Sequence, residues 1–316
     1  MLFNSWLFVV FFAAVFAVYW ALRPARFRVI WLFIASYVFY GWMSPMYPIL
    51  IGYSTLVNYF ISFVLPSSPR KKWWLALSVA NGLLLLGFFK YGAFFAENLN
   101  WLVDQWGIHL TIPKPKGLLP VGISFYTFLI IGYMVDIYRG KVSAERNFFR
   151  FATFVSFFPY LLAGPIERAQ NMLPQLKEGP KFSAENLTEG FSLFIVGLFK
   201  KIALADFLAL YVNKVFGAPG DYPGLASLMA TYAFAWQIYF DFSGYTDMAR
   251  GVAKMFGYNL ILNFNNPYLA TGLGDFWRRW HISLSSWIKD YIYIPLGGNR
   301  HGRIMTYRNM IIAMLL

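Results

Sequence analysis

The sequence predicts an all-α protein, a polytopic bundle of transmembrane helices, and three observations lead to this fold class. First, 59% of the 316 residues are hydrophobic and 13% are charged, whereas a soluble domain of this length needs a polar surface. Second, long uncharged runs alternate with basic clusters. Third, the chain has 12 Trp and 21 Tyr, residue types that collect at membrane interfaces. We therefore expect the lipid bilayer as the first partner.

The charge and cysteine counts exclude several functional classes. The net charge is +13, but the basic residues fall between apolar runs, as cytoplasmic loops require, and no aromatic-basic RNA motif is present. Nucleic acid is therefore not an expected partner. The chain has no cysteine and three histidines, which excludes a cysteinyl acyl intermediate and argues against a metal cluster. We expect no metal and no bound cofactor.

Apolar runs in the first 135 residues predict a series of membrane crossings. Residues 1–22 carry no charge, and roughly 20 apolar residues suffice for a helix to span the bilayer. The uncharged run 29–65 is too long for one span, and Gly and Pro in its middle predict a hairpin of two. Residues 73–89 then cross outward, 90–116 lie at the outer interface, and 117–135 cross back. The positive-inside rule places the basic clusters in the cytoplasm and the N-terminus outside.

The pattern after residue 150 is less regular. Residues 151–166 are apolar but short, with Pro and Gly inside, and we predict a re-entrant segment. Residues 187–211 predict a helix that charged residues interrupt, and 222–240 form another uncharged run. Residues 241–308 are polar yet rich in aromatic side chains, so we expect them to be buried in protein or to line a wet cavity.

The last seven residues, 310–316, are all apolar and follow Arg308 and Asn309. Seven residues are too few to cross a bilayer, which takes roughly 20. This segment is therefore expected to be the start of a further span, which leaves the domain incomplete at its C-terminus. No internal repeat is visible, and we expect residues 1–316 to form a single transmembrane domain.

The most specific polar segment is 275–287, which surrounds His281. On a continuous helix, Trp277 and His281 would share a face. Arg279 and Ser283 would share another. A histidine at membrane depth is costly unless it has a partner or a task, and a neutral imidazole can take a proton from a hydroxyl near pH 7. The two interpretations are a base for acyl transfer to a sugar and a structural histidine that is hydrogen-bonded inside the bundle.

Two further polar segments flank this one. In 239–247, Asp241 and Asp247 follow an apolar run and are expected to face inward. Their candidate partners are Arg250, Arg278 and Arg279, and an ion-pair network is favoured over an acid/base dyad. In 291–303, a Gly-Gly turn precedes two arginines, which fits either phosphate binding or a lipid-facing loop. His109 and His301 are expected to be surface residues.

The motifs together resemble the membrane-bound O-acyltransferase (MBOAT) superfamily and, within it, the bacterial alginate O-acetylase branch. The resemblance runs in order along nearly the whole chain. The matching segments are 119–128 (LPVGISFYTF), 136–140 (DIYRG), 158–168 (FPYLLAGPIER), 240–247 (FDFSGYTD), 276–285 (FWRRWHISLS) and 293–299 (YIPLGGN).

The resemblance implies a fold, an activity and a location. The fold is a helical bundle with re-entrant and interfacial helices around a central funnel, in the bacterial inner membrane, with many passes and a periplasmic N-terminus. The activity is transfer of an acetyl group from a cytosolic thioester, such as acetyl-CoA, toward an exopolysaccharide such as alginate. A periplasmic polysaccharide acetyltransferase is the implied partner, through which the acetyl group would reach the polysaccharide acceptor.

The resemblance also assigns roles to residues. His281 matches the first of the two characteristic histidines of the family and is the predicted catalytic residue. The second, in a Trp-His-Gly motif usually taken as the catalytic base, does not occur within 1–316. The resemblance therefore leaves two roles open for His281: taking the proton, or orienting the donor thioester or the acceptor. The predicted substrate-binding residues are Arg278, Arg279, Trp280, Asp241, Tyr245 and Asp247. Two alternatives stay open: a D-alanyl transferase of teichoic acids, and a secondary transporter, although transporters usually show two related halves.

Overall fold

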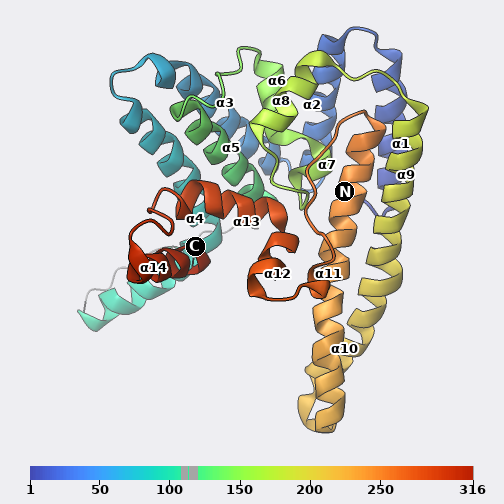
Figure 1. Cartoon of the computed structure of the whole chain (residues 1–316), viewed down its shortest axis with the longest axis vertical. Helices are drawn as coiled ribbons and strands as arrows, with labels where there is room; N and C mark the ends of the chain where they lie inside the picture. Colours follow the sequence, from blue (N-terminus) through green and yellow to red (C-terminus); the bar gives the residue numbers. More distant parts are fainter. Residues whose placement is uncertain (108–112, 114–119, 316) are drawn as a thin grey trace.

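The structure is a computed structural model that describes residues 1–107, 113 and 120–315. Every regular element within these ranges is a helix, so the predicted all-α class is confirmed. Figure 1 shows α3, α4 and α5 on one side of the molecule, α1, α9, α10 and α11 on the other, and α12, α13 and α14 across the front. His109 and the first residue of the 119–128 motif lie outside the described residues.

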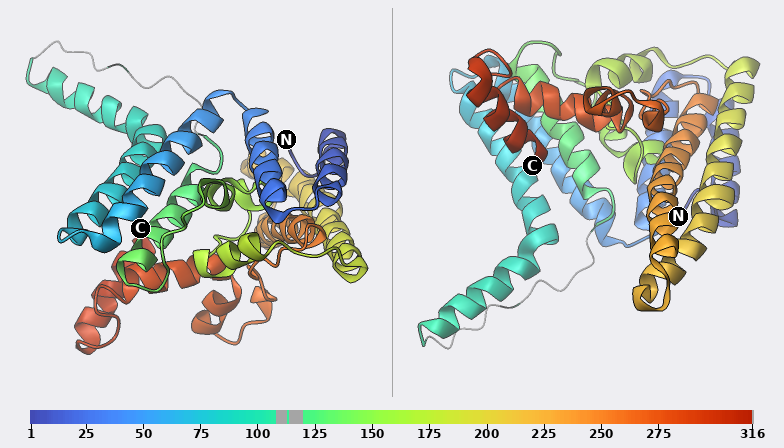
Figure 2. Two further views of the ribbon diagram at one scale, coloured as in Figure 1. Left: turned by 90° about the horizontal axis from the view of Figure 1, so that it is seen from above. Right: turned by 60° about the horizontal axis from the view of Figure 1, so that its bottom comes forward.

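Four helices build the N-terminal part: α1 Trp6–Ala21, α2 Ala25–Gly41, α3 Met46–Ser67 and α4 Lys71–Gln105. The helix predicted in 1–22 and the helical hairpin predicted in 29–65 are confirmed. Among the described residues, α3 and α4 are long and apolar enough to cross a membrane, and α1 is apolar but shorter. Helix α4 continues to Gln105, into the stretch 90–116 that was predicted to lie at the interface, and Figure 2 shows its second half leaving the bundle. The end of that stretch lies outside the described residues.

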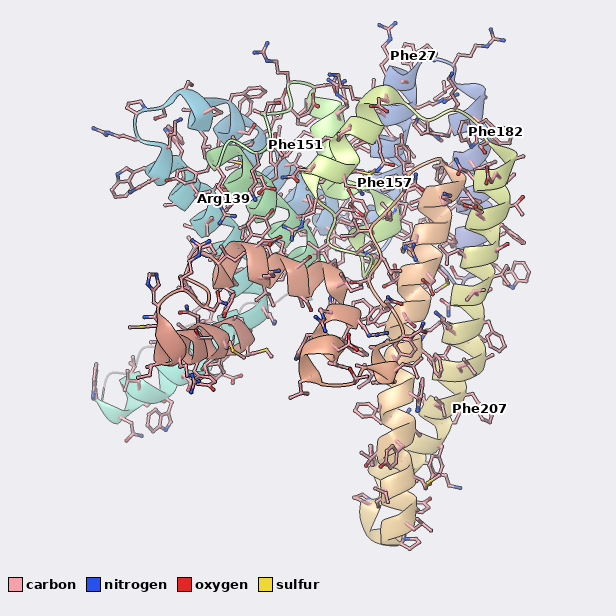
Figure 3. All side chains as sticks on the ribbon, in the orientation of Figure 1. Phe27, Arg139, Phe151, Phe157, Phe182 and Phe207 are labelled. Carbon is pink, nitrogen blue, oxygen red and sulfur yellow. The ribbon has the colours of Figure 1, made fainter. Side chains whose placement is uncertain are left out.

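The centre of the molecule is formed by α5 Ile123–Tyr138, α6 Phe148–Ser156, α7 Phe158–Leu161 and α8 Ala169–Glu178. The side chain of Asn147 caps α6 by accepting a hydrogen bond from the Arg150 N–H at 3.0 Å. Phe151 and Phe157 are fully buried, whereas Phe207 on α10 is 70% exposed and points outward in Figure 3. Apolar side chains therefore fill the centre and also cover the outer surface, as expected where lipid is the solvent.

A long helical hairpin follows, made of α9 Ala184–Phe199, a π-helical segment Lys200–Asp206, α10 Phe207–Gly217 and α11 Gly224–Met255. The charged residues predicted to interrupt the first helix lie in this π-helical segment, and the helix continues through it. Short π-helical segments are frequent at functional sites. Glycines bring the two arms together: a Cβ on Gly197 would lie 2.5 Å from the Gly244 carbonyl oxygen. Only glycine permits this separation.

The C-terminal part contains α12 Leu273–Arg279, α13 Ile282–Ile288, a π-helical segment Lys289–Tyr293 and α14 Gly302–Leu315. The expectation of one continuous helix over 275–287 is wrong, because Trp280 is extended and His281 is left-handed. Trp277 and His281 therefore lie on different elements, as do Arg279 and Ser283. The predicted turn at Gly297 and Gly298 is confirmed, and both glycines have positive φ.

Candidate active site

His281 occupies the turn between two seven-residue helices, α12 and α13. Its φ angle is 41°, in the left-handed region that residues other than glycine rarely adopt. Such conformations need support from the surrounding structure and are concentrated at functional sites. The backbone supplies that support on both sides of His281, because the Ile282 N–H donates to the Asn263 carbonyl at 2.8 Å and the Asn265 N–H donates to the Arg279 carbonyl at 2.9 Å.

The side chain of Asn263 is the centre of the hydrogen-bond network around His281. It is fully buried, and its Oδ1 lies 3.0 Å from His281 Nδ1. The same oxygen accepts from the Ser283 hydroxyl at 2.9 Å and from the Ser283 N–H at 3.3 Å. The Asn263 Nδ2 donates to the hydroxyl of Thr246 on α11 at 3.4 Å. One amide thus connects α11 to the His281 turn.

Ser283 extends the network to the segment between α7 and α8. Its hydroxyl accepts a hydrogen bond from the Ile166 N–H at 3.1 Å. The next residue, Glu167, is buried and accepts from the Ile261 N–H at 2.6 Å and from the Asn171 amide at 2.9 Å. The 164–168 segment is therefore held against the loop that carries Asn263, which fixes the position of both.

Aromatic rings and burial determine the state of the His281 imidazole. Phe242 meets it edge-on with ring centroids 4.8 Å apart, and Phe264 stacks beside it at 6.2 Å. Burial in this turn lowers the pKa of His281 well below its usual range. The imidazole is therefore neutral near pH 7, as a proton acceptor must be.

The predicted residues around His281 on α12 are largely paired with each other. Arg279 lies 3.0 Å from Asp275 and Arg278 lies 3.6 Å from it, with the Arg278 side chain 78% exposed. The expectation that these arginines pair with Asp241 or Asp247 is wrong, because α12 is a separate short helix with its own carboxylate. Trp280 stacks on Phe276 at 5.5 Å between ring centroids.

Asp241 and Asp247 lie on α11 and face the π-helical segment. Asp247 pairs with Lys200 at 2.6 Å and with Arg250 at 3.5 Å, and Asp241 pairs with Lys201 at 2.6 Å. The predicted ion-pair network is confirmed, including the Arg250 partner. The expectation that both carboxylates face inward holds for Asp247 and is wrong for Asp241, whose side chain is 53% exposed. The lysine partners were missed, although two lysines inside an otherwise apolar helical run were the available signal.

Tyr245, the remaining predicted substrate-binding residue, packs into the core. Its ring stacks on Phe3 with centroids 4.8 Å apart, and its buried hydroxyl has no hydrogen-bond partner in the described part of the chain. The structure therefore brings Trp280 close to the aromatic residues beside His281 and leaves Asp241, Asp247 and Tyr245 on other faces of α11. Substrate binding by all six residues stays a prediction.

Sequence reasoning missed Asn263 and Thr246, and it also missed a second polar cluster. Asp136 is buried and accepts from the Tyr291 hydroxyl at 2.8 Å. Arg168 pairs with Asp290 at 3.1 Å and lies over the Tyr291 ring at 4.6 Å. The signals in the sequence were an asparagine-rich run after residue 262 and a carboxylate at the end of an apolar helix.

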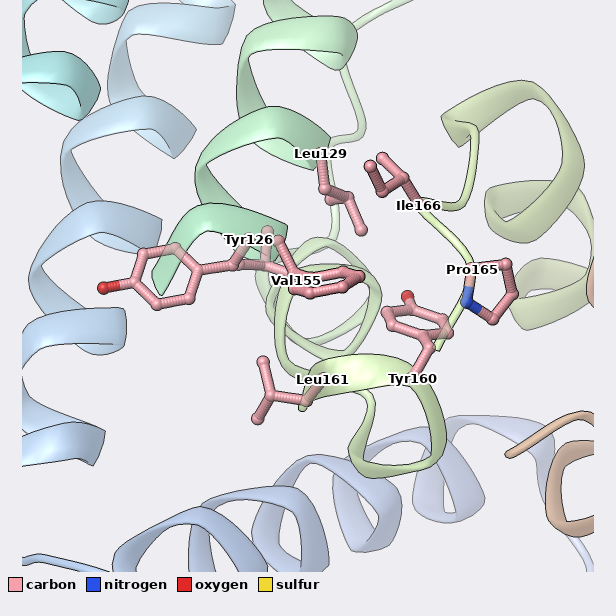
Figure 4. A pocket seen from close by; sticks show the side chains of 8 residues that line it. Tyr126, Leu129, Val155, Tyr160, Leu161, Pro165 and Ile166 are labelled. Atoms are coloured by element: carbon pink, nitrogen blue, oxygen red, sulfur yellow. The ribbon is translucent and has the colours of Figure 1, made fainter. Parts of the chain in front are cut away.

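Figure 4 shows a small cavity that is lined in part by Ile166, whose N–H donates to Ser283. Its volume is about 10 Å³, close to the minimum that one water needs. The lining residues are Phe125, Tyr126, Leu129, Val155, Tyr160, Leu161, Pro165 and Ile166. His281 is not among them, so this cavity is not the polar pocket expected around that residue. Within the described ranges, no group of three His, Asp or Glu side chains could hold a metal ion.

Comparisons with known proteins assign this architecture to a family. The model of the membrane-bound O-acyltransferase family, MBOAT, matches residues 142–316. The chain is 41% identical over 320 residues to the probable alginate O-acetylase of Pseudomonas aeruginosa, covering 100% of this chain and 61% of that protein. It is 40% identical over 321 residues to the corresponding protein of Pseudomonas putida, covering 100% of this chain and 65% of that protein.

Relatives with other printed activities also match. The chain is 37% identical over 353 residues to the peptidoglycan O-acetyltransferase of Helicobacter pylori, with 100% of this chain and 66% of that protein covered. The teichoic acid D-alanyltransferase of Bacillus subtilis is 28% identical over 215 residues, which cover 66% of this chain and 54% of that protein.

The chain spans less than two thirds of the length of the alginate O-acetylases that it matches. The family-model match nevertheless covers more than half of the chain and includes Asn263, His281 and Ser283. The chain therefore belongs to the membrane-bound O-acyltransferase family, whose members are membrane proteins.

Proposed function

We propose that this protein is an O-acyltransferase that passes an acetyl group from a cytosolic thioester donor toward a cell-envelope polysaccharide. The observation that carries the proposal is the neutral imidazole of His281, which the Asn263 amide holds at 3.0 Å in a left-handed turn. The relatives support acetyl as the group, because five alginate O-acetylases match along the whole chain at 39–41% identity.

The chemistry requires a base beside the hydroxyl acceptor. The hydroxyl oxygen attacks the thioester carbonyl, an oxygen–acyl bond forms and the carbon–sulfur bond breaks. His281 takes the hydroxyl proton and returns it to the departing thiolate, so the protein is unchanged at the end. Such a positioned base accelerates a reaction by about 10²–10⁴-fold.

The donor, the acceptor and the location belong to the same proposal. Acetyl-CoA is the proposed donor, and the proposed route to the polysaccharide is through a periplasmic acetyltransferase. The proposed location is the bacterial inner membrane with several passes, because basic side chains such as Arg26 and Lys71 lie in the first turns of the apolar helices α2 and α4.

The test replaces His281 with Ala in the gene at its own locus and measures ester-linked acetate on the purified polysaccharide. We expect acetate to fall by about 10²-fold or more. His301→Ala is the matched control, because His301 is exposed in the turn before α14, and it should leave acetate unchanged. Normal acetate in a His281→Ala strain that contains the normal amount of protein would contradict the proposal.

The same samples separate the two alternatives. Ester-linked alanine on teichoic acid would indicate D-alanyl transfer, which the lower identity of 28% over 66% of this chain makes less favoured. Solute uptake by proteoliposomes without turnover of a labelled thioester would indicate a transporter, for which broken helices and intramembrane charges are also typical.

A further inference from the structure

We propose that Asn263 is a positioning residue that fixes the tautomer of His281, with the proton on Nδ1 and the Nε2 lone pair left for the substrate. This inference rests on the proposed function, which needs a base at position 281, and it adds the tautomer that the 3.0 Å contact with Asn263 selects. The tautomer can be measured without measuring activity.

The first step is the orientation of the Asn263 amide. The Ser283 N–H can only donate, and it points at the amide atom 3.3 Å away. That atom must therefore be the carbonyl oxygen Oδ1 rather than the NH₂ group. The opposite end agrees, because Nδ2 lies 3.4 Å from the Thr246 hydroxyl, which can accept. The Ser283 N–H therefore sets the orientation, and the Thr246 hydroxyl, which can donate or accept, is compatible with it.

The second step is the tautomer. Oδ1 has no proton to give, so the 3.0 Å contact to His281 is a hydrogen bond only when Nδ1 carries the proton. The Ser283 hydroxyl also lies 3.4 Å from His281 Nδ1, but its contact with Asn263 Oδ1 is shorter, at 2.9 Å, and its oxygen accepts from the Ile166 N–H at 3.1 Å. The shorter contact is the better place for the hydroxyl proton. A neutral imidazole held in this way has an unprotonated Nε2.

The third step is the choice of an amide over a carboxylate. The groups that face the ring from α11, from the 263–264 loop and from α13 are Phe242, Phe264, Asn263 and Ser283, all uncharged. The arginines of α12 are bonded to Asp275. A carboxylate at position 263 would raise the pKa of His281, whereas a neutral amide adds no charge beside the ring. The amide fixes the ring and its tautomer without that effect, in the way that a second hydrogen bond orients histidines in other sites.

The first experiment observes the tautomer directly. The full-length protein is labelled with ¹⁵N-histidine in lipid nanodiscs, and the His281 signals are identified by their loss in His281→Gln. We expect a protonated Nδ1 and an unprotonated Nε2 at pH 7. In Asn263→Ala we expect a substantial population with the proton on Nε2. A wild-type protein with its proton on Nε2, or an unchanged tautomer in Asn263→Ala, would overturn the proposal.

The second experiment uses the pH dependence of acyl transfer. Asn263→Asp adds a carboxylate beside the ring, so the pKa of His281 rises and more of the base is protonated at a given pH. We expect the acidic limb of the rate profile to move up by about 1 pH unit or more. Asn186→Asp, the same change in the first turn of α9, where a carboxylate suits the helix dipole, should leave the profile in place. An unmoved limb in Asn263→Asp with retained activity contradicts a positioning role.

The two proposals fail in different ways. If His281→Gln keeps its acetyl transfer, the proposed function is wrong, while the ¹⁵N spectrum still decides the tautomer. If transfer depends on His281 but the spectrum shows the proton on Nε2, the role of Asn263 is wrong and the proposed function stands.

Discussion

Helix α11 separates two polar regions that are built in opposite ways. On one side, Asp247 forms ion pairs with Lys200 and Arg250. On the other, Thr246 begins a network of neutral hydrogen bonds that runs through Asn263 to His281. Two consecutive residues of α11 thus make different contacts. Asp247 forms ion pairs between the long helices, and Thr246 accepts a hydrogen bond from the neutral loop that carries Asn263.

The difference shows where charge is compatible with function in this fold. A carboxylate inside a membrane protein needs a cation nearby, and pairing then uses its charge to hold the helices in place. Beside such a carboxylate the pKa of His281 would rise, whereas uncharged neighbours keep the imidazole unprotonated over a wider pH range. The neutral region therefore holds the imidazole, and the charged region stabilises the scaffold.

Breaking the ionic region should give the largest loss of stability. Asp247→Asn leaves two cations without their carboxylate in a place where the Asp247 side chain is 14% exposed. We expect the free energy of unfolding in detergent to fall by about 3 kcal/mol. Asp241→Asn is the matched control, because that side chain is 53% exposed and its pair should contribute less than about 1 kcal/mol. Equal losses in the two variants would contradict the burial argument.

The glycine contact beside those ion pairs should be next in size. In Gly197→Ala the new Cβ would meet the Gly244 oxygen at 2.5 Å and the Met248 nitrogen at 2.7 Å, so α9 and α11 must move apart. We expect a loss of about 1–3 kcal/mol in thermal or denaturant unfolding. Gly87→Ala in α4 meets nothing within 4 Å and should gain about 0.5–1 kcal/mol from helix propensity. The same sign in both variants would mean that the close contact does not form.

Much of this scaffold could be predicted from the sequence. Uncharged runs and the Gly and Pro residues between them indicated α1, α2 and α3, because burial in lipid depends on local composition. The ion-pair network was also predicted, since a charge in an apolar helix needs a partner. The identity of the partners was not, because Lys200 lies 47 residues from Asp247 in the chain and only the packing of α9 on α11 brings them together.

The candidate site was predicted only in part, for a physical reason. His281 stood out by its composition, but the 275–287 segment contains no Gly or Pro that would indicate a break. The left-handed turn is held by hydrogen bonds that Asn263, 18 residues earlier in the chain, accepts. Local pattern does not contain that information, so a continuous helix was the natural and wrong expectation.

The smallest expected effect tests whether the two regions are independent. Thr246→Val keeps the shape of a side chain on α11 and removes the acceptor of the 3.4 Å bond from Asn263. Because that bond is long, we expect a loss of about 0.5–1 kcal/mol, together with a partial shift of the His281 tautomer in the ¹⁵N spectrum. Thr231→Val is the control, since the Thr231 hydroxyl donates at 2.9 Å to the backbone carbonyl of Ser227 in its own helix.

The size of the Thr246→Val effect also separates two views of α11. If the neutral network only orients His281, stability changes little while the tautomer responds. A loss as large as that of Asp247→Asn would instead mean that the Asn263 loop holds α11 in place. The two faces of the helix would then form one structural unit, and the division between scaffold and base would be wrong.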